Sequence, residues 1–337
     1  MEPIAPMEAL LAEALPDEAG WQFEPKWDGF RCIAVRDGDT IDLWSKSGKP
    51  LGRYFPEVLA MFGRVQPKRF VVDGELLIST GDAVSFDALQ MRLHPAESRI
   101  RKLSESTPAM FMAFDCLALG ERMLAGEPLS ERRAVLKQLL ASQNEDRLLL
   151  SPATEDRKKA LGWLDRGGGA LDGVIAKRLA DPYQPAKRAM VKVKQRRTAD
   201  CVVGGFRYGS KHSEVGSLLL GLYNDAGLLD HVGYTSSIAA KDRAAWTKEL
   251  EALIGSPGFT GDAPGGPSRW ATERSTEWQS LRSEMVVEVL YDQVTAGRFR
   301  HGTKLLRRRP DKAPGQCTME QLAPPLTPAE LKQLLGA

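Results

Sequence analysis

Five segments of the chain combine cations and carboxylates in ways that could serve phosphate chemistry. The first is KWDGFR at residues 26–31. We expect Lys26 to lie in a tight loop, where Gly29 lets the backbone approach a ligand and Arg31 starts a strand. A lysine in such a place becomes a nucleophile if neighbouring cations or a metal lower the pKa of its amine. The alternative is a turn with exposed charges, because short motifs match by chance.

Two further segments place carboxylates within apolar strands. Asp73-Gly74-Glu75 is flanked by valines and leucines, and Asp172 opens the run DGVIAK, which Lys177 closes. A carboxylate is costly to bury without a partner. Each of these carboxylates therefore either lies on a solvated face or serves a ligand, and the sequence by itself leaves both interpretations open.

Two basic segments suit anionic partners. Lys192 and Lys194 are two residues apart, so on a strand both side chains point to one face. Two ammonium groups on one face repel unless an anion such as phosphate lies between them; the alternative is an edge strand protected by lysines. Residues 298–312 hold seven Lys or Arg and one acid, Asp311, which suits a patch for nucleic-acid phosphates or a basic loop.

Strands and turns must bring these segments together. Turn residues and alternation predict a hairpin around Asp37-Gly38 and strands over 70–78, 110–119 and 173–176. Apolar spacing predicts helices over 57–62, 86–93, 130–141 and 154–165. Beyond residue 194 we predict short strands over 201–208, 217–223, 231–234 and 285–291, one helix near 239–253, a loop over 255–268 and a short capped helix over 327–335. Strands around one helix suggest a small barrel such as an OB-fold, starting near Arg197–Thr198.

Composition limits the class of protein. The 337 residues include 46 Lys and Arg against 44 Asp and Glu, which excludes a basic tail-like protein and an acidic disordered one. The length predicts two domains. Four isolated cysteines form no CxxC pair, so we expect no structural zinc site and a reducing compartment. No apolar run approaches the length of a membrane span and no secretory leader is evident, which predicts a cytoplasmic protein.

Taken in this order, the segments resemble the covalent nucleotidyltransferase superfamily of polynucleotide ligases and mRNA capping enzymes. KWDGFR is similar to the motif KxDGxR, and the later motifs are matched by DGE at 73–75, FMAFDCLAL at 111–119, DGVIAK at 172–177, VKVK at 191–194 and RRRPDK at 307–312. The resemblance covers nearly the whole chain and is greatest with the compact bacterial ATP-dependent DNA ligases of the ligase C group. Residues 45–58 also resemble the ligase segment that touches the phosphates of a nicked strand.

The resemblance implies an α+β protein with a nucleotidyltransferase (adenylation) domain of antiparallel sheets and helices over 1–197, and an OB-fold β-barrel over 198–337. It implies an ATP-dependent DNA ligase that seals 3′-OH/5′-phosphate nicks in duplex DNA during repair. Its partners are ATP, Mg²⁺ or Mn²⁺, and nicked duplex DNA, and we expect a monomer at the bacterial nucleoid. The alternatives are an RNA ligase or a capping guanylyltransferase on the same fold, or a non-catalytic nucleic-acid-binding protein.

The resemblance also implies which side chains handle the phosphates. Lys26 would attack the α-phosphate of ATP and carry AMP as a lysyl-AMP phosphoramidate. Lys192 and Lys194 would hold the α-phosphate oxygens. Asp172 would bind magnesium, which helps to keep Lys26 unprotonated. The superfamily usually has Glu at this position, so the shorter Asp172 could reach the metal through water.

The remaining implied roles concern the nucleoside and the leaving group. Glu75 and Arg31 would contact the ribose, Phe114 would stack on adenine, and Glu24 lies in the adenine-contacting segment. A second set would reach the pyrophosphate when the second domain closes, namely Arg309, Asp311 and Lys312. No helical DNA-binding domain is expected before the core, so the two core domains would grip the DNA, aided by loops at 209–217 and 255–268.

Overall fold

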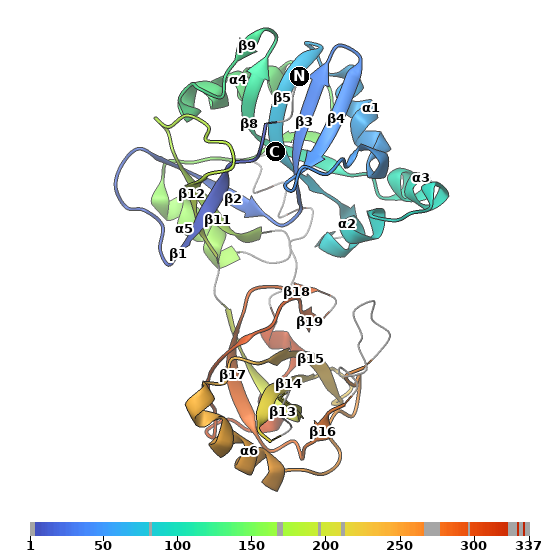
Figure 1. The fold of residues 1–337 in the computed structure, drawn as a ribbon, viewed down its shortest axis with the longest axis vertical. Coiled ribbons are helices and arrows are strands. Elements are labelled where there is room, and N and C mark those ends of the chain that lie inside the picture. The colour runs from blue at the N-terminus through green and yellow to red at the C-terminus, as the bar shows by residue number, and fades with distance from the viewer. Residues whose placement is uncertain are drawn as a thin grey trace. The chain divides into compact units, whose positions relative to one another are not determined.

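The computed structural model describes residues 4–80, 83–166, 171–194, 197–209, 213–265, 277–295 and 297–322, together with 329 and 333. Its contacts divide the chain into two compact units, Met1–Gln195 with Pro324–Ala337, and Arg196–Ala323. Figure 1 shows helices combined with largely antiparallel sheets, which confirms the predicted α+β class. Most of the helix predicted over 327–335 lies outside the described residues.

Two sheets form the first unit. The first has the strand order β1 (Glu8–Ala12), β12 (Arg188–Val193), β11 (Leu171–Arg178) and β2 (Trp21–Trp27). The second has the order β10 (Leu148–Leu150), β8 (Met110–Leu119), β5 (Arg69–Leu77), β3 (Phe30–Asp37) and β4 (Thr40–Ser45), with β9 (Arg122–Met123) beside β8. Neighbouring strands are antiparallel except for β1 with β12 and β10 with β8. A separate small hairpin joins β6 (Ser79–Thr80) to β7 (Ala83–Val84).

Helices cover the sheets of this unit. The four predicted helices are confirmed as α1 (Pro56–Arg64), α2 (Phe86–Arg92), α4 (Leu129–Ala141) and α5 (Arg157–Arg166). Pro56 starts α1, and the Ser85 side chain caps α2 by accepting from the backbone of Ala88 at 3.2 Å. The polar helix α3 (Glu97–Ser106) was not predicted, since it buries only Ile100 and Ser104 and so lacks a clear apolar stripe.

Aromatic rings fill the core between α1 and the second sheet. The ring of Phe62 on α1 lies 5.6 Å from that of Phe70 and 5.0 Å from that of Phe111, measured between centroids. These rings sit among the other buried side chains of β3, β5 and β8. The second sheet is therefore held rigidly from behind, which fixes the side chains on its opposite face.

The second unit is a five-stranded barrel. Its strand order is β15 (Leu229–Thr235), β14 (Val215–Tyr223), β13 (Arg197–Tyr208), β17 (Val286–Tyr291) and β20 (Lys304–Arg308). The backbone of Thr303 donates to Tyr234 O at 3.1 Å, which joins the end of β15 to the start of β20 and closes the sheet. Helix α6 (Arg243–Ala252) lies between β15 and β17 in the chain. This connection and closure confirm the predicted OB-fold.

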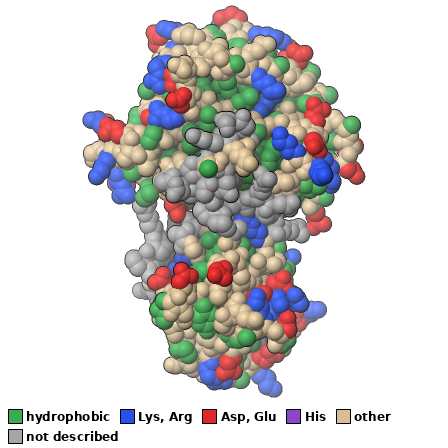
Figure 2. Space-filling view, turned by 180° about the vertical axis from the view of Figure 1, so that it is seen from behind, with side chains coloured by type: hydrophobic (Ala, Val, Ile, Leu, Met, Phe, Trp, Pro, Cys, Tyr) green, Lys and Arg blue, Asp and Glu red, His purple; other side chains and the backbone are tan. Residues whose placement is uncertain are grey.

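Short elements complete the second unit. They are η2 (Ala240–Asp242), β16 (Gln279–Ser280), β18 (Val294–Thr295), β19 (Arg298–Phe299), η3 (Pro314–Gln316) and η4 (Met319–Gln321); η1 (Gly52–Tyr54) belongs to the first unit. On the surface in Figure 2, Lys and Arg are interspersed with Asp and Glu, in keeping with the nearly balanced composition. Within the described residues, none of the helices is long and apolar enough to cross a membrane.

Candidate active site

Lys26 lies on strand β2, so the prediction of a tight loop at this residue is wrong. In the β2–β11 ladder Lys26 is opposite Gly173 and Glu24 is opposite Ile175. The strand was missed because Pro25 interrupts its pattern; proline is tolerated here because β2 is an edge strand. The turn follows at Asp28-Gly29. A Cβ on Gly29 would lie 2.2 Å from Leu76 O, so the turn passes too close to β5 for a larger residue.

Asp172 brings two of the predicted lysines together. Its Oδ2 lies 2.7 Å from Lys26 Nζ and 3.1 Å from Lys194 Nζ. Burial raises the pKa of the Asp172 carboxyl, but the two lysines outweigh burial and hold it below its ordinary value. Gly173 makes the approach possible, since its φ is +139° and a Cβ there would lie 2.0 Å from Val193 O.

The same ion pair determines the charge of Lys26. Burial lowers the pKa of its amine, but the Asp172 carboxylate, with smaller contributions from Glu75 and Asp28, raises it above the ordinary value. Lys26 is therefore a cation in this structure. A protonated amine has no lone pair to donate, so any attack by Lys26 would first require the hold of Asp172 to be weakened. Lys192 shows the opposite shift, because burial and the charges of Lys26 and Lys194 lower its pKa.

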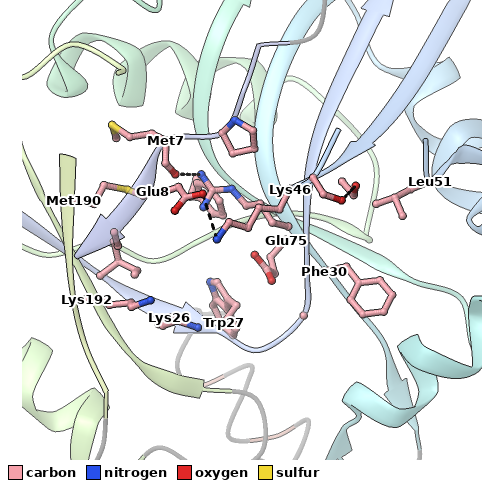
Figure 3. Close-up of a pocket in the computed structure, with 18 of the residues that line it drawn as sticks. Met7, Glu8, Lys26, Trp27, Phe30, Lys46, Leu51, Glu75, Met190 and Lys192 are labelled. Carbon is pink, nitrogen blue, oxygen red and sulfur yellow. Dashed lines mark hydrogen bonds and ion pairs between the residues drawn. The ribbon is translucent and has the colours of Figure 1, made fainter. Parts of the chain in front are cut away.

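A cavity of about 1090 Å³ lies between the two sheets of the first unit. Figure 3 shows Lys26 and Lys192 entering it from the first sheet and Glu75 from the second. The segment predicted to touch DNA phosphates also lines it, through Lys46 and Arg53 among others. This volume is ample for a nucleotide, and its walls carry cations, carboxylates and aromatic rings.

The two carboxylates of the DGE segment have different environments. Asp73 is fully buried and paired: Arg31 Nε and Nη2 each donate to it at 2.6 Å, and the Tyr183 hydroxyl donates at 2.7 Å. Glu75 lies opposite Arg31 in the β3–β5 ladder and faces the cavity. Burial raises the pKa of Glu75 to about 7, although Arg31 and Lys26 oppose this shift. Asp73 therefore fixes Arg31, and Glu75 is the carboxyl available to a ligand.

Phe114 and Glu24 both contact Lys177, a residue to which the sequence analysis assigned no role. Lys177 Nζ lies 2.8 Å from Glu24 Oε2 and 4.5 Å from the centroid of the Phe114 ring. Gln22 Nε2 donates to the other Glu24 oxygen at 2.7 Å. The guanidinium of Arg31 also lies 4.5 Å from the Phe114 centroid. The only sequence signal for Lys177 was its place at the end of DGVIAK.

A divalent cation has limited protein ligands here. Among the described residues, no group of three or more His, Cys, Asp or Glu side chains is arranged to hold a metal. Magnesium is commonly bound by one or two carboxylates together with substrate phosphates and water. Asp172 supplies one such carboxylate. It suits a metal that arrives with a nucleotide, and it does not form a site by itself.

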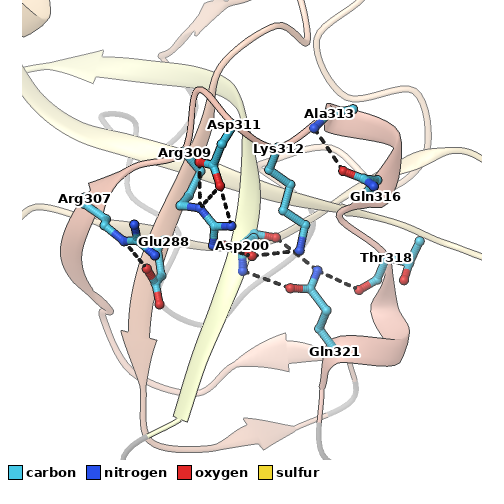
Figure 4. Close-up of polar contacts among 10 residues, drawn as sticks. All are labelled: Asp200, Glu288, Arg307, Arg309, Asp311, Lys312, Ala313, Gln316, Thr318 and Gln321. Atoms are coloured by element: carbon cyan, nitrogen blue, oxygen red, sulfur yellow. Dashed lines mark hydrogen bonds and ion pairs between the residues drawn. The ribbon is translucent and has the colours of Figure 1, made fainter.

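The remaining predicted residues lie in the second unit and contact one another (Figure 4). Arg309 Nη1 lies 2.8 Å from Asp200 Oδ1, Arg309 Nη2 lies 2.9 Å from Asp311 Oδ2, and Lys312 Nζ lies 2.7 Å from Asp200 Oδ2. The hydrogen bond from Arg309 lowers the pKa of Asp311 to about 2. The same hydrogen bond to Asp311 raises the pKa of Arg309. Arg309 and Lys312 are thus anchored by carboxylates. Asp200 was not among the predicted site residues.

Comparisons with known proteins agree with the two units. Residues 5–194 match a family profile described as ATP dependent DNA ligase domain, and residues 211–312 match one described as ATP dependent DNA ligase C terminal region. DNA ligase C1 of Mycolicibacterium smegmatis is 47% identical over 96% of this chain and 95% of its own length. DNA ligase C of Mycobacterium tuberculosis is 44% identical over 97% of this chain and 96% of its own length.

A solved Lig E DNA ligase structure has the same fold. It matches 91% of this chain and all of its own, with a TM-score of 0.53 and 19% identity.

Proposed function

Because this chain belongs to the ATP-dependent DNA ligase family and is a DNA ligase that uses ATP, we propose that Lys26 receives AMP from ATP. The adenylated enzyme then seals 3′-OH/5′-phosphate nicks in duplex DNA during repair. The observation that supports this is the convergence of Lys26 and Lys194 on Asp172, beside the cavity that Lys26 and Lys192 line.

In the first step the Lys26 amine attacks the α-phosphorus of ATP. Before the attack the Lys26 ammonium releases one proton to water; a nitrogen–phosphorus bond then forms, the bond to the pyrophosphate oxygen breaks, pyrophosphate leaves, and the nitrogen loses a second proton to solvent. Lys192 and Lys194 favour this step in two ways. Their charges stabilise the negative charge that builds on the α-phosphate oxygens, and Lys192 disfavours a further cation at Lys26.

Asp172 is the residue that we propose for magnesium, together with the phosphates of ATP. The bound cation would neutralise part of the negative charge of the triphosphate. A carboxylate engaged in this way would attract Lys26 less, and the pKa of the amine would then be lower. The contact that keeps Lys26 protonated in this structure therefore also explains how nucleotide binding could activate it.

We assign the nucleoside to the wall formed by the second sheet. Phe114 offers a ring for adenine, and Glu75 with Arg31 lies where a ribose can be contacted. Glu24 contributes through Lys177, because its carboxylate holds the lysine that also lies over the Phe114 ring.

The second unit is proposed to assist the leaving group. Arg309 and Lys312 would stabilise pyrophosphate, and Asp311 orients Arg309 through their ion pair. In the later steps AMP passes from Lys26 to the 5′-phosphate at the nick. The 3′-hydroxyl then attacks that phosphorus, AMP leaves, and the backbone is joined.

Adduct mapping tests the proposal. The full chain is incubated with α-labelled ATP and magnesium, denatured, separated by electrophoresis and mapped by peptide. We expect one acid-labile label on Lys26, none in Lys26→Ala, and normal labelling in Lys68→Ala, which removes an exposed lysine of the same unit. Label that persists in Lys26→Ala, or label from GTP in preference to ATP, would contradict the assignment.

A further inference from the structure

Asp200 is a buried carboxylate on β13 that contacts two cations of the RRRPDK segment, Arg309 and Lys312. Its residue is 8% exposed. Arg309 Nη1 donates to its two oxygens at 2.8 and 3.0 Å, and Lys312 Nζ donates to Oδ2 at 2.7 Å. Figure 4 shows the two side chains reaching this one carboxylate from the same loop.

The backbone of Asp200 is fixed as well. Its N–H donates to Gln321 Oε1 at 3.0 Å, and Gln321 Nε2 donates to its carbonyl at 3.1 Å. The ladder to β17 pairs Asp200 with Glu288. The carboxylate therefore sits on a rigid support, whereas Arg309 and Lys312 are long side chains that lose much rotational freedom when they are ordered.

We propose that Asp200 is a positioning residue for the adenylation step, because it holds Arg309 and Lys312 together in a shape that can receive a diphosphate. This inference rests on the proposed function of those two cations. Without a carboxylate between them, two neighbouring cations repel and separate. With it, Lys312 still has two of its three ammonium donors for phosphate oxygens. Arg309 and Lys312 side chains stay about one-fifth exposed, at 19% and 22%, so a ligand can reach them.

A neighbouring ion pair provides the matched control. Glu288 lies next to Asp200 across the ladder and accepts from Arg307 Nε at 2.6 Å. The Glu288→Gln variant removes a carboxylate from the same sheet without removing a bond to Arg309 or Lys312. The Asp200→Asn variant keeps the size of the side chain but loses the charge that both cations share.

The experiment compares two steps in the full-length protein. Single-turnover formation of the AMP adduct from ATP and magnesium is measured beside the sealing of a pre-adenylated nick, which needs no pyrophosphate departure. In Asp200→Asn we expect adenylation to slow by about tenfold or more, as for loss of one charge-assisted contact, and sealing to change by less than about threefold. Glu288→Gln should match the wild type in both steps.

Two further variants separate positioning from folding. Asp200→Glu keeps the charge, so it should recover part of the adenylation rate and still lose more in adenylation than in sealing. If Asp200→Asn does not fold, this variant carries the test. In an Arg309→Ala, Lys312→Ala background, Asp200→Asn should cost little more, because its partners are gone.

Adenylation within about twofold of the wild type in Asp200→Asn, or equal losses in both steps, would overturn the inference. Failure of the wild-type protein to form any adduct would instead overturn the proposed function.

Discussion

Replacing Asp172 by Asn should make the Lys26 amine easier to deprotonate, even though it should impair ligation. Asp172 is the main group that raises the pKa of Lys26, through an ion pair of 2.7 Å between Oδ2 and Nζ. Asparagine has nearly the same size, but it carries no charge. Once the counter-charge is gone, burial of Lys26 and the nearby ammonium group of Lys192 favour the neutral amine.

The size of the change follows from the kind of bond lost. A hydrogen bond between charged groups contributes about 1.5–3 kcal/mol, and one pKa unit corresponds to about 1.4 kcal/mol. Lys26 and Asp172 side chains are 23% and 6% exposed, so solvent screens the pair only in part. We therefore expect the pKa of Lys26 to fall in Asp172→Asn, with loss of its proton made easier by about 1.5–3 kcal/mol.

Competitive labelling of amines measures this shift directly. The protein is treated with a trace of an acylating reagent across a series of pH values, and the labelling of Lys26 is read by peptide mass spectrometry. Lys68, which is 55% exposed and paired with Asp39, serves as the internal reference. The control Asp39→Asn breaks that exposed pair and should leave the Lys26 midpoint unchanged, because exposed pairs contribute little. A Lys26 midpoint that stays the same or rises in Asp172→Asn would refute the reasoning.

Three other changes test separate parts of the structure. Glu75 has a pKa of about 7 in the fold against an ordinary 4.5, so its ionisation costs stability as pH rises between those values. Glu75→Gln should therefore be more stable than the wild type at pH 8, by up to about 3 kcal/mol. Denaturant unfolding at pH 5 and pH 8 measures the difference. Gly173→Ala would place a Cβ 2.0 Å from Val193 O and should lower the free energy of unfolding by about 2 kcal/mol or more, again read from denaturant unfolding. Arg309→Ala should slow adduct formation more than sealing of a pre-adenylated nick, and equal slowing in rapid-quench assays would count against its role at the leaving group.

The sequence predicted the elements around the site better than the contacts within it. The strand over 110–119, the hairpin around Asp37-Gly38 and the OB-fold follow from alternation and turn residues, which are local signals. Lys26 was misplaced because Pro25 disguised an edge strand that depends on pairing with β11. Local patterns carry no information on pairing between strands that are distant in the chain.

Long-range pairing also explains why some site residues were missed. In the DGE segment the sequence could not distinguish Asp73 from Glu75, because the difference comes from Tyr183, which lies 110 residues from Asp73 and donates to it. Asp200 was missed for the same reason, since its partner Arg309 lies 109 residues further along the chain. Each of these carboxylates is explained by a partner that only the fold brings near.

Asp172 and Asp200 hold pairs of cations in the same way but are proposed to serve different roles. Each is a buried carboxylate that accepts from two of the cations proposed to meet phosphate, Lys26 with Lys194 in one unit and Arg309 with Lys312 in the other. A carboxylate and a phosphate attract the same donors, so each aspartate keeps a pair of cations gathered before the nucleotide binds. The consequences differ, because a nucleophile must lose its proton whereas a clamp on pyrophosphate must keep its charge. Removing Asp172 should therefore lower the pKa of an amine, and removing Asp200 should slow adenylation while Arg309 stays charged.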